Sequence, residues 1–296
     1  MKIVFLGTGS MQPTRERNLS SIYFNHDSEH ILFDCGEGTQ RQMKIAEIKA
    51  TNLTRVFLSH FHADHVLGLG GMLRNLDANQ YNKTLYVYGP EVLKKFFDNM
   101  VHSAYYGNGI NVKLMEFKDE DNIDCGKFTI EITKLNHSVP SYGFVIQEKD
   151  KRKINLEYTS KFRLTKNPIL GELQKGNDIV WEGKKITVSK GTKLVKGKRL
   201  GIIWDTEECT GCLKIGKDAD LLICESTFSD NESDKAKEYK HLTSKQAANI
   251  ARRSKAKRLV LTHFSQRYKK LDELKKEAQT IFKNTECAED FKEIEI

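Results

Sequence analysis

Three histidines and one aspartate fall within six residues, in the order His-x-His-x-Asp-His from His60 to His65. Imidazole nitrogens and carboxylate oxygens are the ligands that zinc prefers in catalytic sites, which keep one coordination position open for water. His60 and His62 can face one ion, while Asp64 and His65 face a second ion close by. A solvated loop or a structural metal clip is the alternative, but structural zinc sites usually contain cysteine, which this stretch lacks. The spacing therefore predicts a two-metal hydrolase centre.

Further ligand-type residues stand directly after predicted strands. The strand patterns at 55–58, 127–135, 199–204 and 258–262 lead into His60, His137, Asp205 and His263, respectively. Active-site side chains collect at strand ends, where the chain turns at a rigid edge of a sheet. One histidine after a strand is more often structural, but four ligand-type residues in the same situation favour a shared role. We expect them to converge on the metal centre.

An alternation of strand and helix patterns along the 296 residues supplies the framework for this centre. Strands are expected at 2–6, 20–24, 30–33, 55–58, 84–88, 112–117, 127–135, 142–146, 199–204, 220–224 and 258–262. Helices are expected near 38–49, 65–79, 91–100, 244–254 and 270–284. With 39% hydrophobic residues, the chain can build a sizeable core. The patterns predict an α/β protein without internal repeats.

The composition predicts a cytoplasmic protein with no membrane-spanning segment. No run of about 18 apolar residues occurs, and the first residues pass into glycines without a cleavage-site pattern. Six cysteines lie scattered along the chain, unlike the framework of a small disulfide-rich secreted domain, and we expect most of them to be reduced and buried. Cys209 and Cys212 have CxxC spacing. They are either two structural thiols after a strand or a local redox pair close to the metal centre.

A basic segment lies between two of the expected metal ligands. Residues 148–198 contain fourteen lysines and arginines against six acids, a net charge of +8. The whole chain also carries +8, so the remainder is balanced. A solvated face is the alternative. However, an insertion between His137 and Asp205 is expected to emerge close to the active-site edge, where Lys and Arg can hold the phosphates of a nucleic acid substrate without reading its bases.

Several further motifs resemble one enzyme family. They lie at 5–10 (FLGTGS), 13–18 (PTRERN), 33–40 (FDCGEGTQ), 225–227 (EST), 241–243 (HLT) and 261–268 (LTHFSQRY). With the ligand order from His60 to His263, the chain resembles the metallo-β-lactamase superfamily of binuclear zinc hydrolases along nearly its whole length. Within that superfamily it most closely resembles the tRNase Z (ribonuclease Z) family, endonucleases that trim the 3′ end of precursor tRNA. The loop at 13–18 and the segment at 261–268 are more specific than the shared zinc motif.

The resemblance implies a fold and a set of metal ligands. The fold would be a four-layer αββα metallo-β-lactamase sandwich over 1–296, with a protruding basic arm for tRNA binding inserted at 148–198. Two zinc ions per chain would be held by His60, His62 and His137 on one side, by Asp64, His65 and His263 on the other, and by a bridging Asp205. Such ligands also accept iron, manganese or cobalt. Asp34 would orient a ligand histidine. One departure is Trp204, which places a bulky ring where the family usually has glycine before the bridging aspartate.

The resemblance also implies a reaction. The enzyme would hydrolyse the phosphodiester after the discriminator nucleotide of precursor tRNA, leaving a tRNA 3′-hydroxyl and a 5′-phosphorylated trailer. Asp64 would orient the attacking water and take its proton, and His241, helped by Glu225, would protonate the leaving oxygen. His241 could instead only mark a helix start. Residues expected to contact RNA are Arg15, Arg17, Lys161, Arg163, Lys175 and Arg267. The family further suggests a homodimer, in which one subunit's arm clamps the tRNA that is cut in the other.

Two alternatives stay open at this point. A hydrolase of the same fold could act on a small phosphodiester, sulfate ester or lactone, which would explain the metal ligands but leave the basic segment without a role. A non-catalytic RNA-binding module could have kept the fold, although a complete ligand set is not expected in such a protein. The aromatic pair Tyr105 and Tyr106 could stack on a base or only pack within its loop.

Overall fold

The computed structural model describes residues 1–104 and 109–296 of the chain. They fall into two units: unit 1 comprises Met1–Ile146 and Arg199–Ile296, and unit 2 comprises Gln147–Lys198. All of the predicted metal ligands belong to unit 1, and unit 2 coincides closely with the basic segment. Within the described residues, every helix is too short or too polar to cross a membrane.

The first sheet of unit 1 has seven strands in the order β20-β1-β3-β4-β5-β6-β7. They are β1 (Lys2–Gly7), β3 (Ser21–His26), β4 (Glu29–Phe33), β5 (Arg55–Phe57), β6 (Thr84–Gly89), β7 (Asn111–Glu116) and β20 (Glu293–Glu295). The strands β4, β5, β6 and β7 run parallel to one another. Their carboxyl ends therefore meet at one edge of the sheet, where loops carry functional side chains.

The second sheet also has seven strands, in the order β19-β17-β16-β15-β10-β9-β8. They are β8 (Asn122–Asp124), β9 (Phe128–Leu135), β10 (Ser141–Glu148), β15 (Arg199–Ile203), β16 (Leu221–Glu225), β17 (Leu259–Thr262) and β19 (Thr285–Cys287). The strands β15, β16, β17 and β19 are parallel. Every residue of β16 and β17 is buried, which explains their continuous apolar runs, because parallel strands are covered on both faces.

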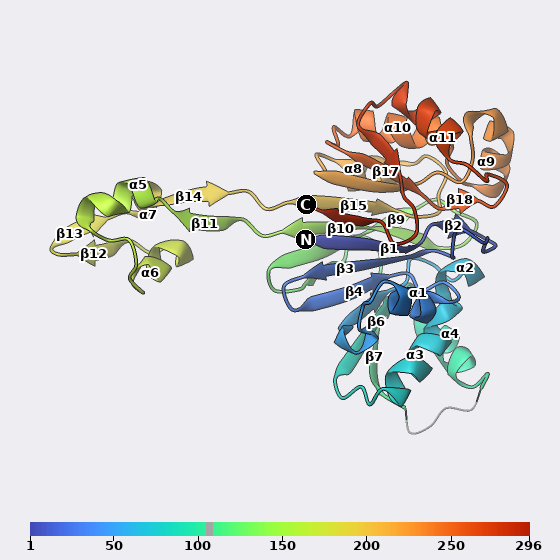
Figure 1. Ribbon diagram of the computed structural model, residues 1–296, viewed down its shortest axis with the longest axis horizontal. Helices are drawn as coiled ribbons and strands as arrows, with labels where there is room; N and C mark the ends of the chain where they lie inside the picture. Colours follow the sequence, from blue (N-terminus) through green and yellow to red (C-terminus); the bar gives the residue numbers. More distant parts are fainter. Residues whose placement is uncertain (105–108) are drawn as a thin grey trace. The chain divides into compact units, whose positions relative to one another are not determined.

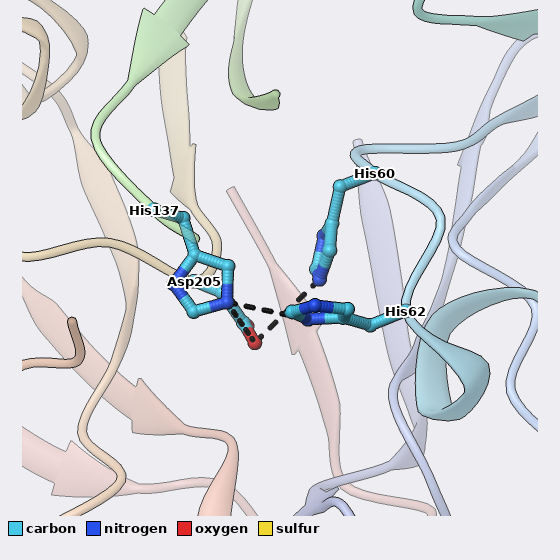
Figure 2. A group of neighbouring side chains, drawn as sticks. All are labelled: His60, His62, His137 and Asp205. Atoms are coloured by element: carbon cyan, nitrogen blue, oxygen red, sulfur yellow. Dashed lines mark hydrogen bonds and ion pairs between the residues drawn. The ribbon is translucent and has the colours of Figure 1, made fainter. Parts of the chain in front are cut away.

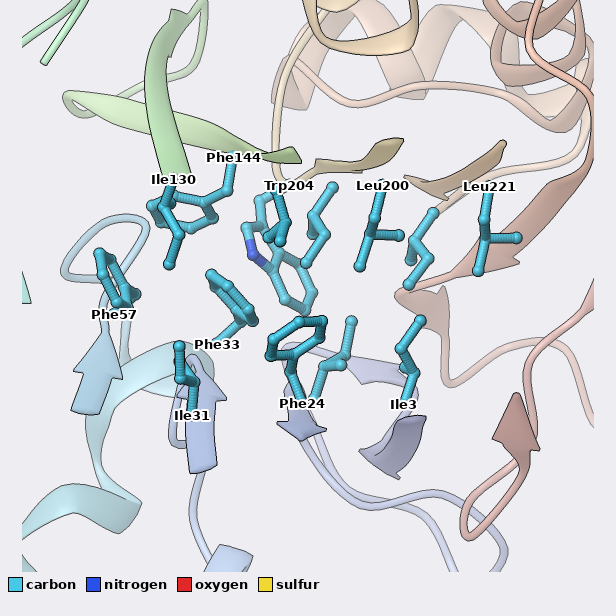
Figure 3. Packing of buried hydrophobic residues seen from close by; sticks show 14 of the residues in the cluster. Ile3, Phe24, Ile31, Phe33, Phe57, Ile130, Phe144, Leu200, Trp204 and Leu221 are labelled. Carbon is cyan, nitrogen blue, oxygen red and sulfur yellow. The ribbon is translucent and has the colours of Figure 1, made fainter. Parts of the chain in front are cut away.

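Aromatic and aliphatic side chains fill the space between the two sheets (Figure 3). Phe33 of the first sheet lies with its ring centroid 5.1 Å from that of Phe144 in the second sheet. Phe24, Phe33, Phe144 and Trp204 are all fully buried. Removing rings of this size from water contributes a large share of the stabilisation of the sandwich. The ends of the same strands carry the candidate site.

Helices cover the outer faces of both sheets (Figure 1). The first sheet is covered by α1 (Thr39–Ile45), α3 (Gly68–Ala78) and α4 (Leu93–Val101), and the second by α8 (Thr210–Gly216), α10 (Ser244–Arg253) and α11 (Asp272–Gln279). Shorter helical segments are η1 (Ala50–Asn52), α2 (Ala63–Val66), η3 (Asp230–Glu232) and α9 (Ser233–Tyr239), and a short parallel pair joins β2 (Gly9–Ser10) to β18 (Phe264–Ser265). The four layers follow the expected order αββα.

Unit 2 has its own small apolar cluster. Its elements are β11 (Lys151–Ile154), α5 (Leu156–Thr159), η2 (Ser160–Phe162), α6 (Leu170–Lys175), β12 (Ile179–Trp181), β13 (Lys184–Ile186), α7 (Val188–Gly191) and β14 (Thr192–Val195). It contains two antiparallel pairs, β11 with β14 and β12 with β13, and its buried apolar cluster consists of Leu164, Leu170, Leu173, Ile179 and Ile186. The basic segment is therefore a folded unit with apolar packing of its own.

Two details of the secondary structure differ from the sequence-based expectation. The helix expected at 65–79 is divided into α2 and α3, with Leu67 between them. The short elements of unit 2, the helices α8 and α9, and the strands β8, β19 and β20 were not expected. These elements have three to seven residues, too few to display a clear hydrophobic period.

Candidate metal centre and active site

The loop after β5 carries the His-x-His-x-Asp-His motif and is held by a close backbone contact. The amide of Gly68 donates to the carbonyl of Cys35 at 2.9 Å, and the amide of Cys35 donates to the carbonyl of His65 at 2.8 Å. A Cβ atom at Gly68 would lie 1.9 Å from the carbonyl oxygen of Gly36. Glycine at this position lets the ligand loop pack directly against the residues that follow β4.

One group of ligand atoms is formed by His60, His62, His137 and Asp205 (Figure 2). The Nε2 atom of His137 lies 3.2 Å from Nδ1 of His62 and 3.9 Å from Oδ2 of Asp205. His60 Nε2 lies 3.7 Å from the same Asp205 oxygen. His60 and His62 come from the loop after β5, His137 follows β9, and Asp205 follows β15. The ends of three strands thus supply the group.

The second group is formed by Asp64, His65, His263 and the other oxygen of Asp205. Asp205 Oδ1 lies 3.3 Å from His65 Nε2 and 3.2 Å from His263 Nε2. His263 Nε2 is also 3.4 Å from Asp64 Oδ2. His263 follows β17 with φ at 59°, a left-handed conformation uncommon in histidine. The two oxygens of Asp205 therefore face different groups, as a bridging carboxylate requires.

The donor set fits two metal ions. Tetrahedral zinc with nitrogen ligands at 2.0–2.1 Å places neighbouring ligand atoms roughly 3.3 Å apart, close to the separations within the second group. His60 Nε2 and Asp205 Oδ1 are buried and have no hydrogen-bond partner among the described residues. Buried polar atoms without partners are costly, and coordination would satisfy both.

The other ring nitrogens of the histidines are held by protein groups. Asp34 accepts hydrogen bonds from His65 Nδ1 at 2.7 Å and from the Ser59 hydroxyl at 2.8 Å. The Ser59 hydroxyl in turn lies 2.9 Å from His60 Nδ1. Asp34 thereby orients one histidine of each group, which extends the role predicted for it. His137 Nδ1 donates to the carbonyl of Lys240 at 2.9 Å. Such contacts leave Nε2 free to bind a metal.

The charged surroundings shift the pKa values of the candidate ligand histidines in different directions. Burial lowers the pKa of His60 well below its ordinary value of 6.5 and also lowers the pKa of His62 and His137. These rings are neutral near pH 7 and available as ligands. Burial also acts to lower the pKa of His65, but the surrounding carboxylates outweigh it and raise the pKa well above 6.5. A divalent cation supplies that positive charge more strongly than a proton.

Glu225 and His241 lie next to both groups of ligand atoms. Glu225 is fully buried at the end of β16, and its Oε1 accepts from His241 Nδ1 at 2.9 Å and from the Thr206 amide at 3.0 Å. His241 Nε2 lies 4.0 Å from Asp205 Oδ2. Thr243 caps α10 through a capping box with Gln246, which fixes the chain two residues after His241. His241 is therefore both close to a helix start and directed at the metal ligands.

Two contributors to the site were missed in the sequence. The Thr227 hydroxyl donates to Glu225 Oε2 at 2.7 Å and lies 2.9 Å from His263 Nδ1, so it links the buried glutamate to a ligand. The amide of Met11 donates to Asp64 Oδ2 at 2.7 Å, with Met11 at a φ of 62°. Thr227 lies in the motif at 225–227, but nothing in the sequence indicates a left-handed conformation at Met11.

A pocket of about 460 Å³ opens above these groups. Asp64, His62, His137, Asp205 and His241 contribute to its polar side. Its remaining wall includes Phe228, Tyr239 and Arg267, and the Arg267 guanidinium lies 4.9 Å from the Phe228 ring centroid. Arg267 also pairs with Glu232 at 2.9 Å. The pocket wall thus carries one cationic group and two aromatic rings.

The residues predicted to contact RNA lie in different environments. Arg15 and Arg267 are exposed in unit 1, and Lys161, Arg163 and Lys175 are exposed in unit 2, where Lys175 pairs with Glu172 at 2.7 Å. The prediction for Arg17 needs correction. Its side chain is buried and donates to the carbonyls of Tyr268 at 2.6 Å and Ser265 at 3.4 Å, so it fixes the loop instead of facing a substrate. Tyr105 and Tyr106 lie outside the described residues.

The point where the chain leaves unit 1 also differs from expectation. The start of β10 lies beside the proposed ligands, because the Ser141 hydroxyl donates to the Asp205 carbonyl at 3.0 Å. The chain leaves unit 1 only after Ile146, further along this strand, and returns to it at Arg199. Five residues of extended strand span roughly 17 Å. The insertion therefore starts at the opposite end of β10 from the metal ligands, because the strand carries the chain away from the site first.

The Trp204 ring points between the sheets and not into the pocket (Figure 3). Its centroid lies 5.5 Å from that of His65, with the planes at 88°, so it supports the ligand ring from the core side. The Trp204 ring is next to the site, as expected, but it packs beneath the His65 ring and does not displace Asp205.

Comparisons with known proteins agree with this geometry. The family model described as "Anti-Pycsar protein Apyc1" matches residues 1–191. Ribonuclease Z of Chlamydia pneumoniae is 36% identical over 292 residues, which cover 98% of this chain and 95% of that protein. The crystal structure of human tRNase Z, short form, has a TM-score of 0.73 at 28% identity and covers 100% of this chain and 99% of its own.

A further solved structure supports the fold. The metallo-β-lactamase fold protein YhfI from Bacillus subtilis has a TM-score of 0.72 at 21% identity and covers 99% of this chain and 98% of its own. The predicted metallo-β-lactamase sandwich is thus confirmed. The chain belongs both to the family that the Apyc1 model describes and, over nearly its full length, to the ribonuclease Z family.

Proposed function

We propose that this protein is an endoribonuclease that removes the 3′ trailer of precursor tRNA. It hydrolyses the phosphodiester after the discriminator nucleotide and leaves a tRNA 3′-hydroxyl and a 5′-phosphorylated trailer. The observation that carries the proposal is Asp205, whose two oxygens face two complete ligand groups in a chain 36% identical to a ribonuclease Z. A non-catalytic RNA-binding module would have no need for this complete set.

We propose two zinc ions per chain as the metals. His60, His62 and His137 would hold one ion, Asp64, His65 and His263 the other, and Asp205 would bind both. Zinc, when bound, lowers the pKa of water and neutralises charge that develops on a phosphate group. The neutral state of His60, His62 and His137 supports this assignment, because zinc binds the unprotonated imidazole.

Two side chains carry out the proton transfers: Asp64 acts on the attacking water, and His241 acts on the leaving oxygen. Asp64, whose carboxylate is fixed by the Met11 amide at 2.7 Å, orients the attacking water and accepts its proton. His241 protonates the leaving 3′ oxygen, and Glu225 holds the imidazolium in place at 2.9 Å. The pocket wall with Arg267 receives the phosphate next to the cut.

Unit 2 is proposed to grip the body of the tRNA. Its excess of eight positive charges and the exposure of Lys161 and Arg163 support this role. We further propose a homodimer in which unit 2 of one subunit holds the tRNA that is cut by the other. A cytoplasmic location is proposed because all six cysteines are free thiols.

A two-substrate experiment tests this function against a small-molecule hydrolase. The variant Lys161→Glu/Arg163→Glu is compared with Lys44→Glu/Lys49→Glu, a matched charge reversal at exposed residues of unit 1. Cleavage of precursor tRNA and of a chromogenic phosphodiester is measured at several salt concentrations. We expect only the unit 2 variant to lose tRNA cleavage, with a shallower salt dependence, while the small substrate is turned over normally. Equal tRNA cleavage by all proteins would contradict the role of unit 2, and turnover of the small substrate alone would favour the rival activity.

A further inference from the structure

Cys209 and Cys212 form a close thiol pair at the start of α8. Their sulfur atoms lie 3.7 Å apart, and the amide of Cys212 donates to the carbonyl of Cys209 at 3.1 Å. Cys209 is partly exposed, whereas Cys212 is fully buried. The other four cysteines are buried and free. This pair therefore combines one accessible sulfur with a second sulfur directly behind it.

The two thiols differ in reactivity. A hydrogen bond from the Cys212 thiol, helped by the amides of Cys212 and Gly211, lowers the pKa of Cys209 from 9.0 to about 5. The same interaction, together with burial, raises the pKa of Cys212 well above its ordinary value. A partly exposed thiolate beside a protonated buried thiol is the arrangement of dithiols that exchange with disulfides.

The pair touches the segments that carry two metal ligands. The Thr206 hydroxyl lies 3.8 Å from the Cys209 sulfur, and it accepts from the amide of Asn136 at 3.0 Å. Thr206 directly follows Asp205, and Asn136 directly precedes His137. The amide of Thr206 also donates to Glu225 at 3.0 Å. Cys209 is thus connected through Thr206 to the segments that hold Asp205, His137 and Glu225.

We propose that Cys209 and Cys212 are a thiol–disulfide exchange site that reacts with low-molecular-weight disulfides such as glutathione disulfide, and that the closed disulfide slows RNA cleavage. The effect on cleavage rests on the proposed function. The exchange itself does not.

The reaction balances in two steps. The Cys209 thiolate attacks one sulfur of the small disulfide, so that a mixed disulfide forms and one small thiolate leaves. Cys212 then gives up its proton to that thiolate and attacks the Cys209 sulfur, which releases the second small thiolate. The two protein thiols lose two electrons in total, and the small disulfide gains both.

Closing the bond requires movement. A disulfide has a sulfur–sulfur distance of about 2.05 Å, so the two atoms must approach by roughly 1.7 Å from their separation of 3.7 Å. Cys212 belongs to α8 and is packed in the core, so Cys209 and the segment from Asp205 to Cys209 make most of this movement. Misplacing an active-site group by about 1 Å can slow turnover by on the order of 100-fold.

The test uses the full-length protein at increasing ratios of oxidised to reduced glutathione. Mass spectrometry after alkylation identifies the disulfide, and precursor tRNA cleavage is measured on the same samples. Cys209→Ser and Cys212→Ala remove the pair, and Cys287→Ser, a buried thiol elsewhere, is the matched control. We expect a Cys209–Cys212 disulfide in the wild type and Cys287→Ser, with turnover at least about tenfold lower and restored by dithiothreitol. Cys209→Ser should keep its turnover under oxidation, whereas Cys212→Ala should stop at the mixed disulfide on Cys209, which mass spectrometry detects.

Three results would overturn the proposal. Absence of the disulfide at every glutathione ratio would remove the exchange site. A complete disulfide with unchanged cleavage would remove its effect on the reaction. Equal loss of turnover in Cys209→Ser would assign the oxidation to another group. Mass spectrometry detects the disulfide independently of RNA cleavage. A protein that does not cut precursor tRNA therefore still shows whether the exchange site exists, so failure of the proposed function and failure of the exchange site are distinguishable.

Discussion

His241 Nδ1 lies 2.9 Å from Oε1 of Glu225, a carboxylate that is fully buried at the end of β16. Burial acts to lower the pKa of His241, but the charge and hydrogen bond of Glu225 outweigh it and raise the pKa from 6.5 to about 9. Because the pKa is raised, the imidazolium persists at pH 7 to 8 and is lost as the pH rises through 9. The proposed proton donor is therefore protonated when the reaction starts.

A pH–rate profile tests this pair. We expect kcat for precursor tRNA cleavage to fall about tenfold per pH unit above pH 9, as the imidazolium is lost. In Glu225→Gln the raising charge is absent, so the fall should begin at a lower pH. An alkaline limb that does not move in Glu225→Gln would contradict the assignment.

His241→Ala separates proton donation from metal binding. We expect turnover to fall by on the order of 10²–10⁴-fold, the usual contribution of a positioned acid. The zinc content should stay at two per chain, measured by atomic absorption on dialysed protein. Loss of zinc in this variant would place His241 among the metal ligands instead.

Gly68 controls the packing of the ligand loop. In Gly68→Ala the new Cβ would meet the carbonyl of Gly36 at 1.9 Å, a backbone atom that cannot move aside cheaply. We expect a loss of about 1–3 kcal/mol or more in the free energy of unfolding and reduced zinc affinity. Gly71→Ala in the same helix is the control, because its Cβ would meet only the flexible Gln40 side chain at 2.7 Å. Equal urea midpoints for the two variants would contradict this account.

The strand framework and the convergence of the proposed ligand residues were predictable, whereas the buried position of Arg17 was not. Strands such as β16 and β17 are fully buried and therefore appear as apolar runs, and the ligands stand at their ends where the sequence changes character. The role of Arg17 depends on the carbonyls of Ser265 and Tyr268, which are about 250 residues away in sequence. The sequence does not show which backbone carbonyls accept hydrogen bonds, so it does not distinguish a buried arginine from an exposed one.

The short strands of unit 2 and the point where it leaves unit 1 were also not predictable from the residue types. Its strands have only three or four residues and many lysines, so neither alternation nor composition indicates a strand. The direction of β10 decides where the insertion begins, and direction is a property of sheet topology. Met11 was missed because its contribution is a backbone amide in a left-handed conformation.

Trp204 offers a test of the core beneath the site. The ring is fully buried, and its Nε1 has no hydrogen-bond partner among the described residues. Trp204→Phe removes that polar atom and a limited volume, so we expect a change within about 1.5 kcal/mol in the free energy of unfolding and an unchanged zinc content. Trp204→Ala should cost about 3–5 kcal/mol because it leaves a cavity. Loss of zinc in Trp204→Phe would show that the indole itself positions His65.

Mapping the cut in a precursor tRNA with a 3′ trailer at nucleotide resolution tests the proposed two-metal ribonuclease. Reactions contain the untreated protein, the protein with chelator, and the chelated protein after zinc is restored. We predict one cut after the discriminator nucleotide, a tRNA 3′-hydroxyl and a trailer 5′-phosphate, with cleavage abolished by the chelator and recovered with zinc. Cleavage that survives the chelator, or no cleavage after zinc is restored, would contradict the proposed two-metal ribonuclease.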